Sequence, residues 1–271
     1  MERKELKNEE KNRYTKIIER IFFSKFSDGM TKVPFSREEI IHTAKELKIE
    51  LPKNLGDVIY SFKYRTPMPE SIIKESSDER QWTIRNIGKG LYAFVLIKNP
   101  IITPGTLMQK IKIPDATPGI IAKYSLDDEQ ALLAKIRYNR LLDIFMGITC
   151  YSLQNHLRTS VVGIGQIETD EIYVGVDKKG LHYIFPVQAK GENEKIGIVQ
   201  IEQDWYMCKE KFPELICIPI ASQMVEGDTI ALICFSIDEN ENIVIAGERH
   251  YSLVDKDKIT KQDLEKYCEL P

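Results

Sequence analysis

The segment from Ile167 to Gly191, IETDEIYVGVDKKGLHYIFPVQAKG, holds the residues best suited to chemistry. Two runs rich in β-branched and aromatic residues are joined by the turn sequence DKKG, which predicts a β-hairpin. Because side chains alternate between the two faces of a strand, Glu168 and Asp170 share one face of the first strand. By the same alternation, Gln188 and Lys190 share one face of the second strand. We therefore expect an acid, an amide and a lysine to converge at one end of a sheet.

These residue types predict metal-assisted hydrolysis of a phosphodiester. A carboxylate, an amide oxygen and a backbone carbonyl form an all-oxygen site for a hard cation such as Mg²⁺, which keeps several water ligands and bridges to a substrate phosphate. A lysine two residues along the strand can stabilise or help to deprotonate the attacking water. It also offsets the charge that grows on the reacting phosphate.

The pattern resembles that of the PD-(D/E)xK nuclease superfamily, the fold of most type II restriction endonucleases. In that family an Asp at the head of one strand is followed by an acidic residue, any residue and a Lys on the next strand of a hairpin. Asp170 matches the first position, and Gln188-Ala189-Lys190 matches the second group after 17 intervening residues. The resemblance implies that Asp170, Gln188 and the Ala189 carbonyl bind the metal, Mg²⁺ or Mn²⁺. It also implies that Lys190 is the charged catalytic group.

Gln188 departs from the family pattern, which usually has an acidic residue there. An amide still offers an oxygen but brings no negative charge, so we expect weaker metal binding. Some members of the superfamily work with an amide at this position. Glu168, on the same predicted face as Asp170, or Glu192, just past the motif, could supply the missing charge. The same departure leaves open a protein that has lost catalysis.

The elements around the motif predict a mixed sheet flanked by helices. A helical region is expected from Leu126 towards Leu157, and an amphipathic helix over residues 196–211. Strands are expected at residues 164–176, 181–188, 215–219, 229–237 and 242–246. The helices before and after the hairpin match the core order of the family over about residues 126–220. Gln154, His156 and Arg158 are expected at the end of the long helix, either as phosphate contacts or as a polar helix C-terminus.

The N-terminal part predicts a DNA-binding module. Helices are expected at residues 7–25, 36–50 and 54–64, the second starting at a capping box, and a hairpin follows at residues 81–98. This is the order of a winged helix. The fold class expected for the chain is therefore α/β, with an N-terminal winged helix-turn-helix followed by a restriction-endonuclease-like mixed sheet. The residues expected to contact DNA are Lys53, Asn54, Ser61, Lys63, Tyr64 and Arg65 on the third helix, Arg85 and Lys89 in the wing, and Arg158.

Composition and charge are consistent with two units. The 271 residues are 42% hydrophobic and 29% charged, which is typical of globular domains. Residues 1–140 hold 26 Lys and Arg against 19 Asp and Glu, whereas residues 141–271 hold 12 against 22. We place a winged-helix domain at 1–98, a proline-containing connector with one short strand at 99–125, and a nuclease domain at 126–271. The longest apolar run has 7 residues and the N-terminus is charged, so we expect a soluble, cytoplasmic protein that does not enter a membrane.

The resemblance and the charge split together predict a metal-dependent endonuclease that hydrolyses phosphodiester bonds in double-stranded DNA, similar to type II restriction enzymes. The expected partners are double-stranded DNA, a cognate DNA methyltransferase and a second copy of the chain. Three alternatives stay open. They are a DNA-binding protein with a degenerate nuclease core, a repair nuclease selective for DNA structure, and a protein-interaction scaffold that never touches DNA.

Overall fold

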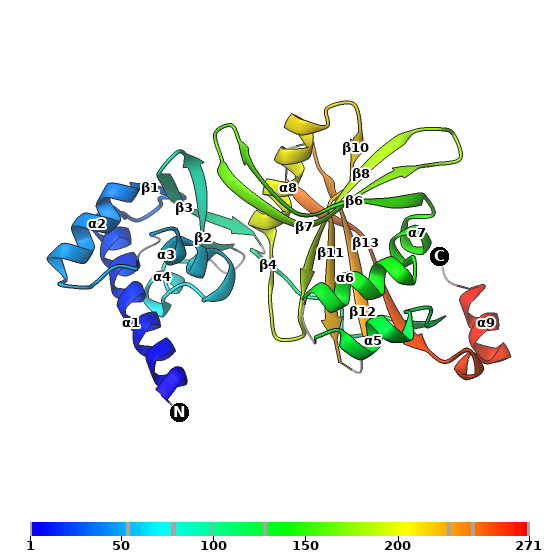
Figure 1. Cartoon of the computed structure of the whole chain (residues 1–271). Helices are drawn as coiled ribbons and strands as arrows, with labels where there is room; N and C mark the ends of the chain where they lie inside the picture. Colours follow the sequence, from blue (N-terminus) through cyan, green and yellow to red (C-terminus); the bar gives the residue numbers. More distant parts are fainter. Residues whose placement is uncertain are drawn as a thin grey trace. The chain divides into compact units, whose positions relative to one another are not determined.

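The structure is a computed structural model that divides the chain into two units (Figure 1). It describes residues 2–52, 55–76, 80–98, 100–126, 129–226, 229–239 and 242–269, without the side chains of residues 2–12, 64 and 65. Unit 1 contains residues up to Ile102 together with the short segments 160–165 and 197–199. Unit 2 contains the remainder of the chain from Thr103 onward.

Unit 1 combines helices with a small antiparallel sheet. Its elements are α1 (Glu2–Phe23), β1 (Lys32–Ser36), α2 (Arg37–Glu46), α3 (Gly56–Tyr60), the π-helical turn η1 (Ser61–Arg65), α4 (Glu70–Ile73), β2 (Arg80–Gly88), β3 (Leu91–Lys98) and the short β4 (Ile101–Ile102). The strand order in the sheet is β1-β3-β2. The sequence predicted α1, α2 and the β2–β3 hairpin, whereas the helix expected at 54–64 consists of the short α3 followed by the π-helical turn η1. Neither α4 nor β1 was predicted, and the five residues of β1 include a proline and pair only with β3 among the described strands.

Local sequence explains where α2 begins and how the turn between β2 and β3 forms. The predicted capping box is present, because the Ser36 side chain accepts from the Glu39 N–H and the Glu39 carboxylate accepts from the Ser36 N–H. Gly90 has a φ of +68°, which suits glycine in the tight turn between β2 and β3. Ile17 and Phe22 of α1 pack with Phe94 of β3 in the buried core of the unit.

Unit 2 is built on one large mixed sheet, so the mixed α/β class is confirmed. The order of its main strands is β5-β13-β12-β11-β8-β7-β6, and the short β10 also pairs with β8. The strands are β5 (Lys110–Pro114), β6 (Thr149–Val161), β7 (Gly165–Val176), β8 (His182–Lys190), β10 (Ile216–Cys217), β11 (Ile220–Val225), β12 (Thr229–Ile237) and β13 (Ile243–Val254), with a separate short β9 (Ile196–Gly197). β8 runs parallel to β11 and antiparallel to β7.

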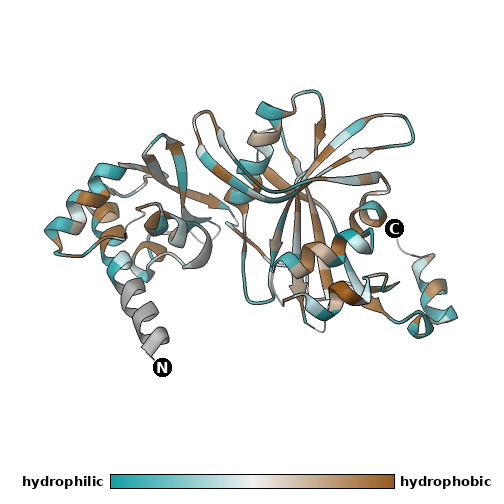
Figure 2. Cartoon of the chain, viewed as in Figure 1, coloured by the Kyte–Doolittle hydropathy of each residue, from teal (hydrophilic) through white to brown (hydrophobic). Residues whose placement is uncertain are grey.

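Unit 2 also contains several short helices. They are α5 (Gly119–Tyr124), α6 (Glu129–Tyr138), α7 (Leu141–Met146), α8 (Ile198–Lys211), the 3₁₀ turn η2 (Lys256–Lys258) and α9 (Lys261–Tyr267). Leu132 and Ile136 of α6 belong to the same buried cluster as Val187 of β8 and Ile220 of β11. Hydrophobic residues run along the central strands in Figure 2, as expected for a sheet that is covered on both faces.

The prediction of one helix reaching Leu157 is wrong. Arg140 and Gly147 both adopt left-handed backbone conformations, with φ of +50° and +64°, and these residues interrupt and end the helical region. Residues 149–161 then form β6, at the edge of the sheet. Most of its side chains are exposed, so the apolar alternation that signals a strand is missing. Gln154, His156 and Arg158 therefore lie on a strand and not at a helix C-terminus.

The expected connector contributes to the large sheet. β5 overlaps the short strand predicted there and pairs in parallel with β13. Residues 103–125 consequently group with unit 2. Further along the chain, the expected strand at 215–219 is reduced to the two residues of β10, and β11 follows without having been predicted.

The length and charge of the helices bear on whether any of them could cross a membrane. α8 has 14 residues, and α1 has 22 residues but a strongly charged sequence. Within the described ranges, no helix is long and apolar enough to cross a membrane.

Candidate active site

The predicted hairpin is present and its strands separate at the candidate site. β7 and β8 pair from Val176↔His182 to Glu171↔Val187. Beyond that pair, the Ala189 N–H donates to Asp170 Oδ2 at 2.9 Å instead of to a backbone carbonyl. The Asp170 carboxylate thus accepts a backbone hydrogen bond from β8. This bond holds the carboxylate against the end of that strand.

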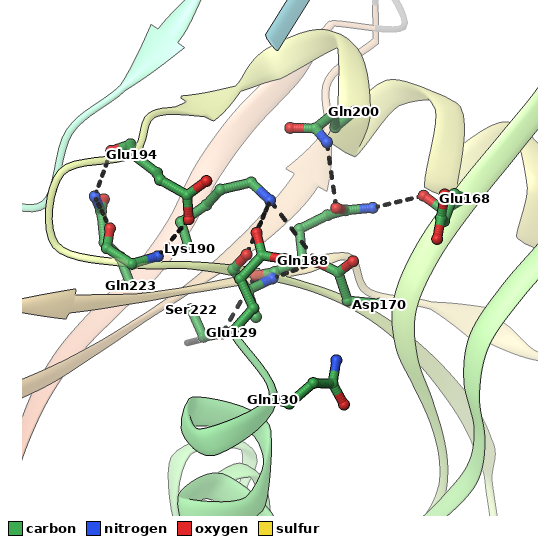
Figure 3. A network of polar contacts seen from close by, with 12 residues as sticks. Glu129, Gln130, Glu168, Asp170, Gln188, Lys190, Glu194, Gln200, Ser222 and Gln223 are labelled. Atoms are coloured by element: carbon green, nitrogen blue, oxygen red, sulfur yellow. Dashed lines mark hydrogen bonds and ion pairs between the residues drawn. The ribbon is translucent and has the colours of Figure 1, made fainter. Parts of the chain in front are cut away.

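Four residues converge there, and we call them the Lys190 cluster: Glu129, Asp170, Ala189 and Lys190. Figure 3 shows Glu129, Asp170 and Lys190. Lys190 Nζ donates to Glu129 Oε1 and to the Ala189 carbonyl, both at 2.9 Å. It also lies 3.8 Å from Asp170 Oδ2. The ammonium group is therefore surrounded by three oxygen atoms from α6, β7 and β8.

Burial and charge set the electrostatics of this cluster. Burial raises the pKa of both the Asp170 and the Glu129 carboxyl groups, and the nearby Lys190 ammonium only partly offsets this effect. Burial also disfavours the charged form of Lys190, yet Asp170 and Glu129 outweigh it and raise the pKa of the lysine. With two carboxylates and one ammonium, the ionised cluster has an excess negative charge that favours binding of a further cation.

Gln188 belongs to a second, buried network behind the cluster. Its Nε2 donates to Asp204 Oδ2 at 2.8 Å and to the Glu168 carbonyl at 3.2 Å. The other oxygen of Asp204 accepts from Thr169 Oγ1 at 2.5 Å. Complete burial raises the pKa of Asp204 to about 7, although both hydrogen bonds favour its charged form. Gln200 Nε2 lies 3.5 Å from Gln188 Oε1.

The structure brings some predicted residues together and separates others. Asp170, Ala189 and Lys190 meet as expected, and Gln188 lies next to them on β8. The Glu168 side chain instead turns to Arg158, at 3.0 Å, and to His156, at 3.6 Å. Glu192 is exposed just beyond β8. Neither of these two acids joins the Lys190 cluster.

Glu129 and Asp204 are functional candidates that the sequence did not single out. Glu129 lies in an acidic stretch at the start of a helix, where such residues commonly interact with the helix dipole. Asp204 lies within an amphipathic helix, and nothing in its spacing relates it to β7 or β8. Only the packing of α6 and α8 on the sheet places these acids at the site.

The oxygen atoms around Lys190 are of the type that a hard cation binds. Across the described residues, no group of three or more His, Cys, Asp and Glu side chains is placed to bind a metal ion. The donor set would instead combine the Asp170 and Glu129 carboxylates with the Ala189 carbonyl, which already surround one positive charge. Mg²⁺ accepts such a set because it binds one or two carboxylates and keeps several waters.

Unit 1 places its predicted DNA-contacting residues on and beside the β2–β3 hairpin. Lys89 is exposed in the turn, and Arg85 lies on β2. Lys63 Nζ donates to Asn86 Oδ1 at 3.1 Å, and the Ser61 hydroxyl lies 2.8 Å from that of Thr66. Lys53 and Asn54, and the side chains of Tyr64 and Arg65, lie outside the described part of the chain.

Comparisons of the chain with protein-family models, with curated proteins and with solved structures give no match. The inferences about function therefore rest on the geometry of the two units.

Proposed function

We propose that unit 2 is a metal-dependent nuclease core that hydrolyses phosphodiester bonds in double-stranded DNA. The observation that carries the proposal is the Lys190 cluster, in which an ammonium group lies among two carboxylates and a carbonyl where two antiparallel strands separate. The order of elements supports it, since α6 and α7 precede the strands β6, β7 and β8, and α8 and β11 follow them. These features agree with the resemblance to the PD-(D/E)xK superfamily.

In this proposal each residue of the cluster has a distinct role. Asp170, Glu129 and the Ala189 carbonyl would hold Mg²⁺ or Mn²⁺, with Gln188 offering its amide oxygen. A bound divalent ion supplies an activated water and neutralises charge on the phosphate. Lys190, released from one of its carboxylate partners, would donate to the reacting phosphate and stabilise the charge that develops on it.

We propose further that unit 1 is a winged helix that docks on the DNA duplex. The helices α1, α2 and α3, the sheet order β1-β3-β2 and the exposed Lys89 in the β2–β3 turn support this assignment. The excess of Lys and Arg in residues 1–140 is the charge balance that a polyanion attracts.

Sequence-specific cutting, as in a type II restriction enzyme, is the form of this activity that we favour. It would bring a cognate DNA methyltransferase as a partner, and a second copy of the chain would allow both strands to be cut. A repair nuclease selective for DNA structure would use the same site. Discrete fragments from a long plasmid would support the first form, whereas a smear, or cutting limited to branched DNA, would support the second.

A second candidate is a DNA-binding protein without nuclease activity. The observation in its favour is that Gln188 brings no charge and its amide is engaged by Asp204 and by the Glu168 carbonyl. A protein-interaction scaffold remains the alternative in which unit 1 does not contact DNA.

Cleavage of a supercoiled plasmid with Mg²⁺ or EDTA tests the proposed activity. We expect cutting only with the metal, and a loss of at least about 100-fold in the Lys190→Ala variant because a charge-stabilising donor is removed. Lys261→Ala is the matched control, since the Lys261 side chain is 90% exposed on α9. Cutting by Lys190→Ala at the wild-type rate would remove the lysine from the reaction, and no cutting by wild type with either metal would favour the inert DNA-binder.

Salt dependence of DNA binding tests the role of unit 1. Changing Lys63→Ala and Arg65→Ala together should weaken binding and lower the slope of log K against log salt, because each lost phosphate contact contributes about 0.9 to B-DNA slopes. The pair Lys258→Ala and Lys261→Ala serves as a control of equal charge in unit 2. An unchanged slope would move the DNA-binding surface elsewhere, and a wild-type protein that does not bind DNA would favour the scaffold.

A further inference from the structure

The buried network behind the Lys190 cluster fixes which way the Gln188 amide faces. Gln188 Nε2 has two neighbours, Asp204 Oδ2 and the Glu168 carbonyl, and both are acceptors. If the amide were turned over, its oxygen would face both of these acceptors and could donate to neither. The NH₂ group must therefore be the one that faces Asp204 and the Glu168 carbonyl. The amide oxygen therefore faces away from Asp204 and lies 3.5 Å from Gln200 Nε2 (Figure 3), and it is the atom that Gln188 can offer to a cation.

Asp204 holds this arrangement from α8. Its side chain is buried, and its two oxygens accept from Gln188 on β8 and from Thr169 on β7. The carboxylate thus connects the helix to both strands of the candidate site. It also interacts electrostatically with both Asp170 and Lys190.

The residue types at positions 188 and 204 depend on each other. A glutamate at position 188 would bring a second carboxyl group to within hydrogen-bond distance of Asp204, so the pair would either bury two like charges together or have to take up a proton. A glutamine avoids both penalties by donating to the aspartate. An amide on β8 and an acid on α8 therefore form a matched pair.

From this geometry we infer that Asp204 is a positioning residue of the candidate metal site. It orients the Gln188 amide so that the amide oxygen, which among the described residues only the long 3.5 Å contact with Gln200 engages, can turn to the cation, and it brings from α8 the carboxyl group that position 188 lacks. This inference rests on the proposed function of unit 2. A buried aspartate with only a structural role would stabilise the fold but would not change metal affinity.

A double-mutant cycle of Asp204→Asn and Gln188→Glu tests separately whether positions 188 and 204 depend on each other and whether Asp204 affects metal binding. In Asp204→Asn the new amide can donate to Thr169 Oγ1 and accept from Gln188, so the hydrogen bonds persist while the charge is lost. In Gln188→Glu two carboxylates oppose each other. In the double variant the new asparagine donates to the new glutamate, so the hydrogen bond between positions 188 and 204 is restored with its charge on β8, while the hydrogen bond to the Glu168 carbonyl stays lost.

The four full-length proteins would be compared by thermal unfolding in EDTA and by calorimetric titration with Mn²⁺ alone. We expect Gln188→Glu to lower the unfolding midpoint by about 5 °C, and the double variant to recover part of this loss, since contacting residues couple strongly. We expect Asp204→Asn to weaken Mn²⁺ binding about tenfold, as changes to residues that orient a ligand do. The double variant should bind Mn²⁺ at least as well as wild type.

Asp255→Asn is the matched control, because the Asp255 side chain is 83% exposed and remote in sequence from the site. If Gln188→Glu and Asp204→Asn had additive effects on the unfolding midpoint, the inferred dependence between positions 188 and 204 would be overturned. Unchanged Mn²⁺ affinity in Asp204→Asn, with coupled midpoints, would leave Asp204 a structural residue and overturn its role towards the metal. Wild-type protein that binds no Mn²⁺ would overturn both that role and the proposed metal-dependent activity, whereas coupled Mn²⁺ binding without plasmid cleavage would count against the nuclease alone.

Discussion

Strand β7 carries two buried acids next to each other in sequence, and they meet different surroundings on its two faces. Glu171 faces α6, where Arg137 donates to one of its oxygens through Nε at 3.0 Å and Nη2 at 2.8 Å. Ser152 Oγ donates to the same oxygen at 2.5 Å. Asp170 lies on the opposite face, and there Lys190 contacts both Asp170 and Glu129, the first residue of the same helix α6, which reaches Lys190 at the end of β8.

The difference between the faces lies in their charge balance. Glu171 and Arg137 form a closed pair of one acid and one base, and the pair raises the pKa of Arg137 further. The Lys190 cluster has two acids for one base, so its ionised form lacks one positive charge. A buried ion pair by itself is commonly structural, whereas acids in excess around a buried lysine make a candidate functional site.

The largest expected difference between the faces is in cleavage. Asp170→Asn should lower the cleavage rate by at least about 100-fold, because a full charge is lost from the proposed metal site. Its stability should change by no more than about 1 kcal/mol, since burial already disfavours the ionised acid and an amide can still accept from Ala189. Glu171→Gln should do the reverse, with a loss of about 2–4 kcal/mol in the free energy of unfolding and nearly normal cleavage when folded.

Urea unfolding and plasmid cleavage at a temperature where both variants are folded would measure these effects. The estimate for Glu171→Gln is below that for a fully buried pair because one-third of the Arg137 side chain is exposed. Equal losses of cleavage in the two variants would show that the faces do not differ in function.

Much of the hairpin was predictable from local sequence. The turn residues, the β-rich runs and the period of two placed Asp170 and Glu171 on opposite faces, and Gln188 and Lys190 on one face. The two runs were recognisable as strands because β7 and β8 lie inside the sheet, where burial on both faces favours β-branched and aromatic residues. β6 has no such pattern, since it is an edge strand that is largely exposed, and it was mistaken for a helix.

The partners of the hairpin were not predictable in the same way. Glu129 is 61 residues from Lys190 in sequence, and Asp204 is 16 residues from Gln188 on a different element. Their approach depends on how α6 and α8 pack on the sheet. Local spacing therefore predicted the acid and the lysine of the motif, while the excess negative charge became visible only in the folded unit.

A last prediction tests whether that excess charge matters. Glu129→Gln would leave one acid and one base in the Lys190 cluster, which is the balance already present between Glu171 and Arg137. We expect the Mg²⁺ concentration at half-maximal cleavage to rise about tenfold, because a cation that dehydrates reluctantly depends on carboxylate ligands. The rate at saturating Mg²⁺ should fall less than in Asp170→Asn, since Asp170 and Lys190 both remain. Glu265→Gln, an exposed acid on α9, is the control of equal charge change.

Each result of this titration bears on the comparison of the two faces. A shifted midpoint with a largely retained maximal rate would support Glu129 as part of the cation site. An unchanged midpoint would show that Glu129 serves only as an ion-pair partner of Lys190, as Arg137 does for Glu171. The excess negative charge of the Lys190 cluster would then have no role in metal binding. A loss of cleavage that no Mg²⁺ concentration restores would place Glu129 in the reaction itself, because a carboxylate that only attracts the metal can be compensated by more metal.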